Sequence, residues 1–135
     1  DLRVANSNLA KHPNQNWTAQ EKAEIEEKKK QNPDEQRWKL MKEMVEATLN
    51  NEPNTVAYHW SLDKDEKYCH VYECYKNGEA AVSHLETFKS KYAGRMLALG
   101  EATKFDVYGV ITDDVYAALD GFGANYMSPI GGFVR

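Results

Sequence analysis

Two neighbouring segments of alternating residues constrain the fold more than any other feature of the sequence. In the first, residues 55–62, apolar and aromatic side chains recur at every second position: Val56, Tyr58, Trp60 and Leu62. A period of two is typical of a β-strand, because successive side chains point to opposite faces. The second segment, residues 68–75, follows after a short polar stretch, residues 63–67. Such a connection predicts an antiparallel hairpin.

Neither face of the second segment is cleanly polar. One face carries Tyr68, His70, Tyr72 and Cys74, and the other carries Cys69, Val71, Glu73 and Tyr75. Helices can cover one face of a sheet, but a second, uncovered aromatic face would be a patch that soluble monomers rarely expose. We therefore expect a homodimer in which the two sheets face each other, since a two-fold interface is self-complementary.

Helical patterns flank this hairpin. Asp34 is the expected cap of a helix that ends by about Asn51, before Pro53, and its apolar stripe is Trp38, Met41, Val45 and Leu49. Asn77 is the expected cap of a second helix with the stripe Ala81, Leu85, Phe88 and Tyr92. His84 lies about 60° from this second stripe and so borders the buried face.

The remaining patterns complete an α+β arrangement. A third strand is expected at residues 103–110 and a short helix at residues 112–119, and residues 121–135 are expected to form a covering segment or edge strand. An additional strand at residues 2–5 would give the order βαββαβ, a ferredoxin-like antiparallel sheet with helices on one face. Residues 1–33 are expected to be a polar extension that supplies the first strand and an extra helix, and residues 34–135 are expected to form the domain.

Composition excludes several classes of protein. The chain has 135 residues, 41% of them hydrophobic, which suits one domain. A formal charge of −4 gives no basic field for nucleic acid or an anionic membrane, and no apolar run approaches the ~20 residues that span a bilayer. Cys69 and Cys74 point to opposite faces of one strand and cannot form a disulfide, which favours a reduced, cytoplasmic setting.

Residues 52–135, about three-fifths of the chain, resemble the antibiotic biosynthesis monooxygenase (ABM) domain family. The likeness is carried by EPNTVAYHW at residues 52–60, CHVYECY at 69–75, NGEAAVSH at 77–84, GFGANY at 121–126 and GGF at 131–133. Members of this family are dimeric α+β barrels. The resemblance therefore implies that the ferredoxin-like domain dimerises into such a barrel.

The resemblance also implies an activity. Some members oxidise quinol-like or polyaromatic substrates with O₂, without a metal or flavin, in a pocket between the sheet and the helices. By this likeness His84 occupies a helix position that often carries histidine, and the expected pocket rings are Tyr58, Trp60, Tyr72 and Tyr75. Haem-degrading relatives pair an aromatic residue on this helix with a histidine about ten residues later, whereas this chain has His84 and then Gly94, so haem is not expected.

The candidate residues each allow more than one role. His84 is the best candidate base, since a site bordering the apolar stripe would depress its pKa, or it bonds a backbone carbonyl at the helix end. His70 donates to a substrate oxygen or to a tyrosine in the dimer core. Arg95 pairs with an anionic substrate or lies at the surface. Glu73, a carboxylate flanked by aromatic residues, is a rival base or an ion-pair partner.

No two histidines share metal-ligand spacing with a carboxylate on one helix face, so no metal site is predicted. The resulting hypothesis is a cofactor-independent monooxygenase that acts on a small quinol-like or aromatic substrate with O₂. The alternative is a non-catalytic module on the same dimeric scaffold, which binds a small ligand or docks on a partner through the polar extension.

Overall fold

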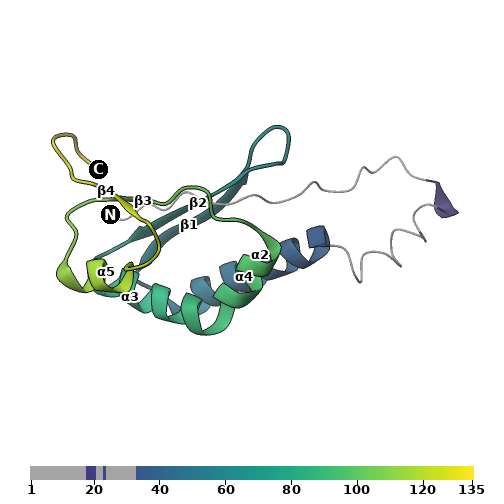
Figure 1. The fold of residues 1–135 in the computed structure, drawn as a ribbon, viewed down its shortest axis with the longest axis horizontal. Helices are drawn as coiled ribbons and strands as arrows, with labels where there is room; N and C mark the ends of the chain where they lie inside the picture. The colour runs from purple at the N-terminus through teal and green to yellow at the C-terminus, as the bar shows by residue number, and fades with distance from the viewer. Residues whose placement is uncertain (1–17, 21–22, 24–32) are drawn as a thin grey trace.

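The computed structural model describes residues 18–20, 23 and 33–135 (Figure 1). In chain order the described elements are α2 (Pro33–Asn51), β1 (Thr55–Leu62), β2 (Cys69–Tyr75), α3 (Gly78–Thr87), a π-helical turn η1 (Phe88–Tyr92), α4 (Ala93–Leu99), β3 (Asp106–Tyr108), α5 (Asp113–Ala118) and β4 (Asn125–Met127). The strand expected at residues 2–5 lies outside the described residues, as does most of the polar helix expected before residue 32.

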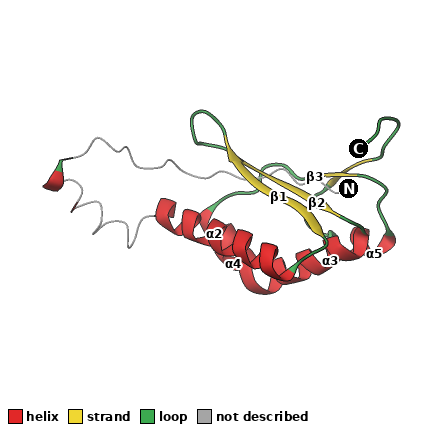
Figure 2. Cartoon of the chain, turned by 180° about the vertical axis from the view of Figure 1, so that it is seen from behind, coloured by secondary structure: helices red, strands yellow, loops and turns green. Residues whose placement is uncertain are grey.

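The predicted hairpin is confirmed. Strands β1 and β2 pair antiparallel, with Tyr58 opposite Glu73 and Trp60 opposite Val71. The polar connection is closed by Asp63, whose side chain accepts hydrogen bonds from the backbone N–H groups of Lys67 and Tyr68 at 2.8 and 3.0 Å. The helices lie along one side of this hairpin, as Figure 2 shows, so the protein has the predicted α+β class with helices on one face of an antiparallel sheet.

A bulge changes the start of β1. The register shifts between Thr55 and Ala57, so the side chain of Val56 is 66% exposed rather than directed inward. The alternation predicted for Val56 is therefore wrong, because one extra residue in a strand reverses which face the preceding side chains occupy. Tyr58 and Trp60 still face the helices, where both lie beside a cavity described below.

Helix α2 faces the core with a different stripe from the one predicted. Leu40, Met44 and Thr48 are buried, whereas Leu49 is 80% exposed. The prediction missed this orientation because Thr48 is polar and does not stand out in an apolar pattern. The Thr48 side chain lies near the Glu52 carboxylate on this buried side and helps to lower the pKa of Glu52. The helix ends as predicted, since Glu52 N–H still donates to Thr48 O at 3.0 Å.

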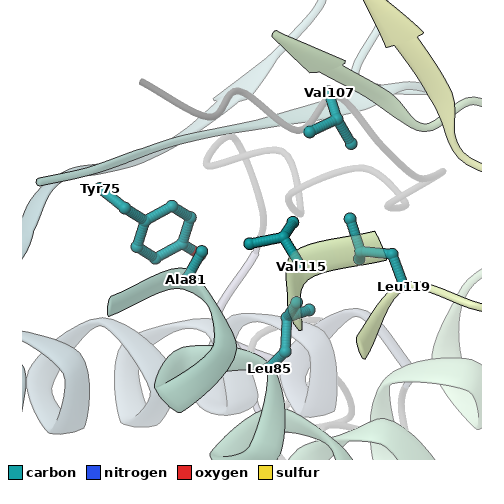
Figure 3. Packing of buried hydrophobic residues seen from close by; sticks show 6 residues of the cluster. All are labelled: Tyr75, Ala81, Leu85, Val107, Val115 and Leu119. Carbon is teal, nitrogen blue, oxygen red and sulfur yellow. The ribbon is translucent and has the colours of Figure 1, made fainter. Parts of the chain in front are cut away.

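Helix α3 follows its predicted pattern closely. The Asn77 side chain accepts a hydrogen bond from Ala80 N–H at 2.9 Å and so caps the helix. Ala81 and Leu85 pack in the main core against residues of β2, β3 and α5 (Figure 3). The buried members of this core are Tyr75, Ala81, Leu85, Val107, Val115 and Leu119. A second buried cluster joins α2 to the end of the π-helical turn through Leu40, Met44 and Tyr92.

The C-terminal part differs from the predicted third strand. Only Asp106–Tyr108 form β3, which pairs in parallel with β4 and not with the hairpin. Gly109 has a φ of 122°, a conformation that ends the extended strand, and Val110 beyond it is 85% exposed. The edge strand expected in residues 121–135 is confirmed as β4. Among the described helices, none has the length and apolar character needed to cross a membrane.

The close approach of α3 to α5 gives a testable prediction. A Cβ at Gly78 would lie 2.5 Å from Thr112 Oγ1 and 3.0 Å from Val115 Cγ2. Gly78→Ala should therefore lower the free energy of unfolding by about 1–3 kcal/mol, because α3 must move away from Thr112 and from the buried Val115. Gly94→Ala is the matched control, since nothing lies within 4 Å of its added Cβ; it should raise stability by about 0.4–1 kcal/mol. Urea denaturation checks both, and equal stability of the two variants would contradict the packing.

Candidate functional site

A cavity of about 370 Å³ lies beneath the hairpin. Its walls come from the helix-facing side of β1 and β2, from α2, α3, the π-helical turn and α4, from the segment that leads to β3, and from residues 122–123. Most of the side chains that line it are apolar, among them Met44, Val71, Leu85, Phe88, Met96 and Phe105. A largely apolar cavity of this size with a few polar groups is the usual form of a small-molecule site.

Two charged side chains, His84 and Glu73, lie in one wall of this cavity, and a third, Glu52, lies behind His84. His84 Nδ1 lies 2.8 Å from Glu52 Oε1, and His84 Nε2 lies 3.3 Å from Glu73 Oε1. The three side chains are only 6%, 14% and 11% exposed, respectively. His84 is held by α3, Glu73 by β2, and Glu52 by the turn that follows α2. We call these residues the Glu52–His84–Glu73 cluster.

The two carboxylates determine the charge of His84. Burial by itself would lower the pKa of His84, but hydrogen bonds and charge from Glu52 and Glu73 outweigh burial and raise that pKa from 6.5 to about 9. The predicted depression of the pKa is therefore wrong in direction. His84 is an imidazolium at neutral pH, donates from both nitrogens, and has no lone pair with which to act as a base. Nor does its ring bond a backbone carbonyl, the other role expected for it, since both nitrogens face carboxylates.

Hydroxyl groups support both carboxylates. The Tyr75 hydroxyl donates to Glu73 Oε2 at 3.0 Å, and Thr55 Oγ1 donates to Glu52 Oε1 at 3.1 Å. Burial and the Glu73 charge raise the pKa of Tyr75 well above 10, so this hydroxyl keeps its proton. Burial would also raise the pKa of Glu52, yet the hydrogen bond and charge of His84 hold that pKa below 4.5. Glu52 is consequently ionised at neutral pH.

Two buried donors beside the cluster make no hydrogen bond of ordinary geometry among the described residues, although the Trp60 N–H lies close enough to the Tyr58 hydroxyl to offset part of the rise in its pKa. They are the hydroxyl of Tyr58 and Nε1 of Trp60, and both side chains line the cavity. Burial and the nearby Glu73 charge raise the pKa of Tyr58, so its hydroxyl is protonated and can donate. A buried donor without an acceptor costs about 1–3 kcal/mol, which a ligand oxygen in the cavity would recover.

The structure brings together only part of the predicted site. Tyr58, Trp60 and His84 line the cavity, while Tyr75 is buried behind it and bonds Glu73. His70 and Tyr72 lie on the opposite face of β2 and are exposed, because they alternate with the cavity-facing Val71 and Glu73. In a single chain they are therefore not cavity residues.

Arg95 also lies away from the cavity. Its guanidinium makes two hydrogen bonds of 2.9 Å to the carboxylate of Glu43 on α2, and both side chains are about half exposed. Of the two roles expected for Arg95, the structure shows the surface position, with Glu43 and not a substrate as its anionic partner. Glu52 is the residue that sequence reasoning missed. A glutamate in a turn gives no periodic signal, and only its position just before a cavity-facing strand could have pointed to it.

The cluster predicts how stability changes with pH. The folded-state pKa of His84 is raised from 6.5 to about 9, so its contribution is complete below pH 6.5 and is lost as pH rises through 9. At ~1.36 kcal/mol per pKa unit, the loss in unfolding free energy is about 3 kcal/mol. Glu52 acts in the opposite sense, since its contribution is present above pH 4.5 and is lost in acid.

Urea denaturation at a series of pH values measures this dependence. The decline between pH 6.5 and 9 should be absent from the His84→Gln variant, which cannot titrate. The assignment would be wrong if wild type and variant lost stability in parallel over that range.

Metal binding has no support in the described part of the chain. No group of three or more histidine, cysteine or acidic side chains there is arranged to hold a metal ion. Within the cluster, both nitrogens of His84 are already directed at carboxylates.

Fold and site together define a class: a small α+β protein with an apolar cavity beneath an antiparallel hairpin and a buried carboxylate–imidazolium cluster in its wall. The crystal structure of MupZ from Pseudomonas fluorescens has a similar fold, with a TM-score of 0.67 over 99% of this chain and 93% of that chain. The two sequences are 13% identical, so the likeness concerns the fold alone. No protein-family model and no curated protein sequence matches the chain.

Proposed function

We propose that the cavity binds a small, flat, mostly apolar molecule with an acidic hydroxyl, and that Glu73 removes the proton of that hydroxyl. The observation that carries this proposal is the position of the Glu52–His84–Glu73 cluster in the wall of an otherwise apolar cavity. Buried charge is costly and is typically concentrated at functional sites. Glu73 replaces His84 as the base, because the histidine holds a proton on each nitrogen.

The Tyr58 hydroxyl and the Trp60 N–H can donate hydrogen bonds to the anion that this proton transfer leaves. Removing the proton leaves an oxyanion, and Tyr58 O–H and Trp60 Nε1–H are buried donors on the strand opposite Glu73. Donors that are already in place stabilise developing negative charge without reorganisation. A phenol- or quinol-type ligand supplies both the acidic hydroxyl and the flat apolar body that the cavity walls favour.

The reaction that we propose to follow is cofactor-independent monooxygenation, as the resemblance to the ABM family implies. The electron-rich anion of the substrate reacts directly with O₂. For a hydroquinone, one oxygen atom becomes a ring hydroxyl, the other leaves as water, and the ring is left as the quinone. The substrate therefore supplies all four electrons, and the protein supplies the base, the orientation and the exclusion of water.

Oxygen uptake with a panel of benzo- and naphthohydroquinones tests this proposal. At least one substrate should consume O₂ well above its rate of autoxidation, and isotopically labelled dioxygen should place one labelled atom in the product. The proposed monooxygenase activity would be contradicted if the compounds bind saturably but no member of the panel consumes O₂ faster than it autoxidises.

That second result would favour the alternative function, a non-catalytic module that binds a small aromatic ligand on the same scaffold. The observation in its favour is that both nitrogens of His84 are saturated by carboxylates, an arrangement that can hold a fold together without catalysis.

We also propose that the protein is a homodimer. Helices cover one side of the β1–β2 hairpin (Figure 2), while the other side presents the exposed residues His59, Ser61, His70 and Tyr72. Light scattering at micromolar concentration should give twice the 15.4 kDa of one chain. Tyr72→Glu should shift the mass toward one chain, because it places like charges across the two-fold axis. A wild-type protein with the mass of one chain would contradict the dimer.

A cytoplasmic setting completes the proposal. Cys69 and Cys74 are both buried and form no disulfide, and proteins that keep buried thiols are typical of reducing compartments.

A further inference from the structure

The Glu52–His84–Glu73 cluster spans the protein between two different spaces. Glu73 and His84 line the apolar cavity. Glu52, at the other end, lines a separate polar cleft of about 230 Å³. The walls of that cleft are mainly the turn after α2 and the first turns of α3, including Asn54, Asn77, Glu79 and Ser83. One carboxylate of the pair therefore faces the candidate substrate, and the other faces away from it.

The imidazole ring of His84 does not by itself determine its orientation or which of its nitrogens carry protons. A histidine with one partner can exchange its proton between two nitrogens or turn its ring, and either change would turn the group facing Glu73 from a donor into an acceptor. A second carboxylate on the far side removes this freedom. Glu52 Oε1 is 2.8 Å from Nδ1, the shorter of the two contacts, and is itself held by Thr55.

We propose that Glu52 is a positioning residue for the cavity: it holds the ring of His84 in one orientation with a proton on each nitrogen, so that His84 Nε2–H always donates to Glu73. Glu73 Oε1 is then committed to His84 and Oε2 to Tyr75. The carboxylate is thereby fixed in the cavity wall, with its remaining lone pairs directed to a ligand. Glu52 acts on the cavity without facing it.

The groups that face His84 come from each surrounding element. They are Glu52 from the turn after α2, Glu73 and Tyr75 from β2, and Tyr58 from β1, whose ring centroid is 5.2 Å from that of His84. Both tyrosine hydroxyls remain protonated, so the two glutamates are the charges that determine the state of the ring. The inference rests on the proposed function only in taking Glu73 as the base.

Nuclear magnetic resonance of labelled histidine tests the inference directly. In the wild-type protein, His84 should show two protonated ring nitrogens at pH 7 and titrate with a pKa of about 9. In Glu52→Gln this midpoint should fall by at least about one unit, and in Glu52→Asp, which keeps the charge, it should fall less. Glu79→Gln is the matched control, because Glu79 lines the same cleft and has no contact with the ring; its midpoint should equal that of wild type.

A second readout is the pH profile of kcat/KM for hydroquinone oxidation. Because His84 loses its proton at a lower pH in Glu52→Gln, the alkaline limb of the profile should move to lower pH in that variant and not in Glu79→Gln. A purely structural role for Glu52 would lower the amount of folded protein without moving either midpoint.

The outcomes separate this inference from the proposed function. A neutral His84 in the wild-type protein at pH 7 would overturn the inference without any variant, as would an unchanged midpoint in a folded Glu52→Gln. If the midpoint falls as expected while no hydroquinone is oxidised, the positioning role of Glu52 stands and the proposed reaction fails. If wild type oxidises hydroquinone but the midpoint does not move, the reaction stands and the positioning role fails.

Discussion

Replacing Glu73 with glutamine is expected to lower kcat for hydroquinone oxidation by about 10²- to 10⁴-fold, the usual contribution of a general base. Glutamine has nearly the same shape and can accept the hydrogen bond of His84 through its amide oxygen, while its amide N–H can donate to the Tyr75 hydroxyl oxygen. It cannot take a proton from a substrate hydroxyl. Because binding depends mainly on the apolar walls and on Tyr58 and Trp60, KM should change much less than kcat.

The control for this variant is Glu86→Gln, an exposed glutamate on the same helix as His84. It carries the same change of charge on the molecule and should leave kcat within about twofold of wild type. Steady-state oxygen uptake measures both variants, with circular dichroism to confirm that each is folded. A Glu73→Gln protein that is folded and keeps wild-type kcat would remove Glu73 from the mechanism.

Replacing His84 with leucine is expected to lower the free energy of unfolding by about 3–5 kcal/mol, because it leaves two buried carboxylates without the cation between them. Their oxygens lie 2.8 and 3.3 Å from the ring nitrogens that would be lost. Leucine fills most of the space, so the loss is mainly electrostatic and not the cost of a cavity. Denaturation in urea near pH 7 measures the difference.

The triple variant Glu52→Gln, His84→Leu, Glu73→Gln isolates that cause. With all three charges removed, no buried carboxylate is left without a counterion. The free energy of unfolding should therefore return most of the way to the wild-type value. If the triple variant were as unstable as His84→Leu alone, packing of the imidazole ring would be the source of the loss and the electrostatic account would be wrong.

Local patterns predicted the elements that position the site. The alternation in residues 55–62 and 68–75 gave the hairpin and the inward direction of Tyr58 and Trp60, and Asn77 marked the start of α3. The same patterns failed where a strand contains a bulge or where a polar side chain faces the core. The bulge at Val56 and the inward-facing Thr48 leave no periodic trace in the sequence.

The charge state of the site was beyond the reach of such patterns. The position of His84 beside the apolar stripe predicted its burial correctly, and burial alone would have depressed its pKa. The result is the reverse because Glu52, 32 positions away in the chain, and Glu73, on a different element, converge on the ring. Contacts of this kind depend on the tertiary arrangement, which helix and strand periodicity does not specify. Alternation likewise could not say which face of β2, that of Tyr72 or that of Glu73, would meet the helices.

We propose that the Glu52–His84–Glu73 cluster serves the cavity and does not merely hold the fold together. The most direct measurement follows the His84 ring resonances of the wild-type protein at pH 7 while 2-naphthol, a flat phenol, is added. The account predicts that these resonances shift and saturate with the same Kd as the change in tryptophan fluorescence expected from Trp60 in the cavity wall. Saturable binding that leaves the His84 resonances unmoved, or no saturable binding at all, would contradict it.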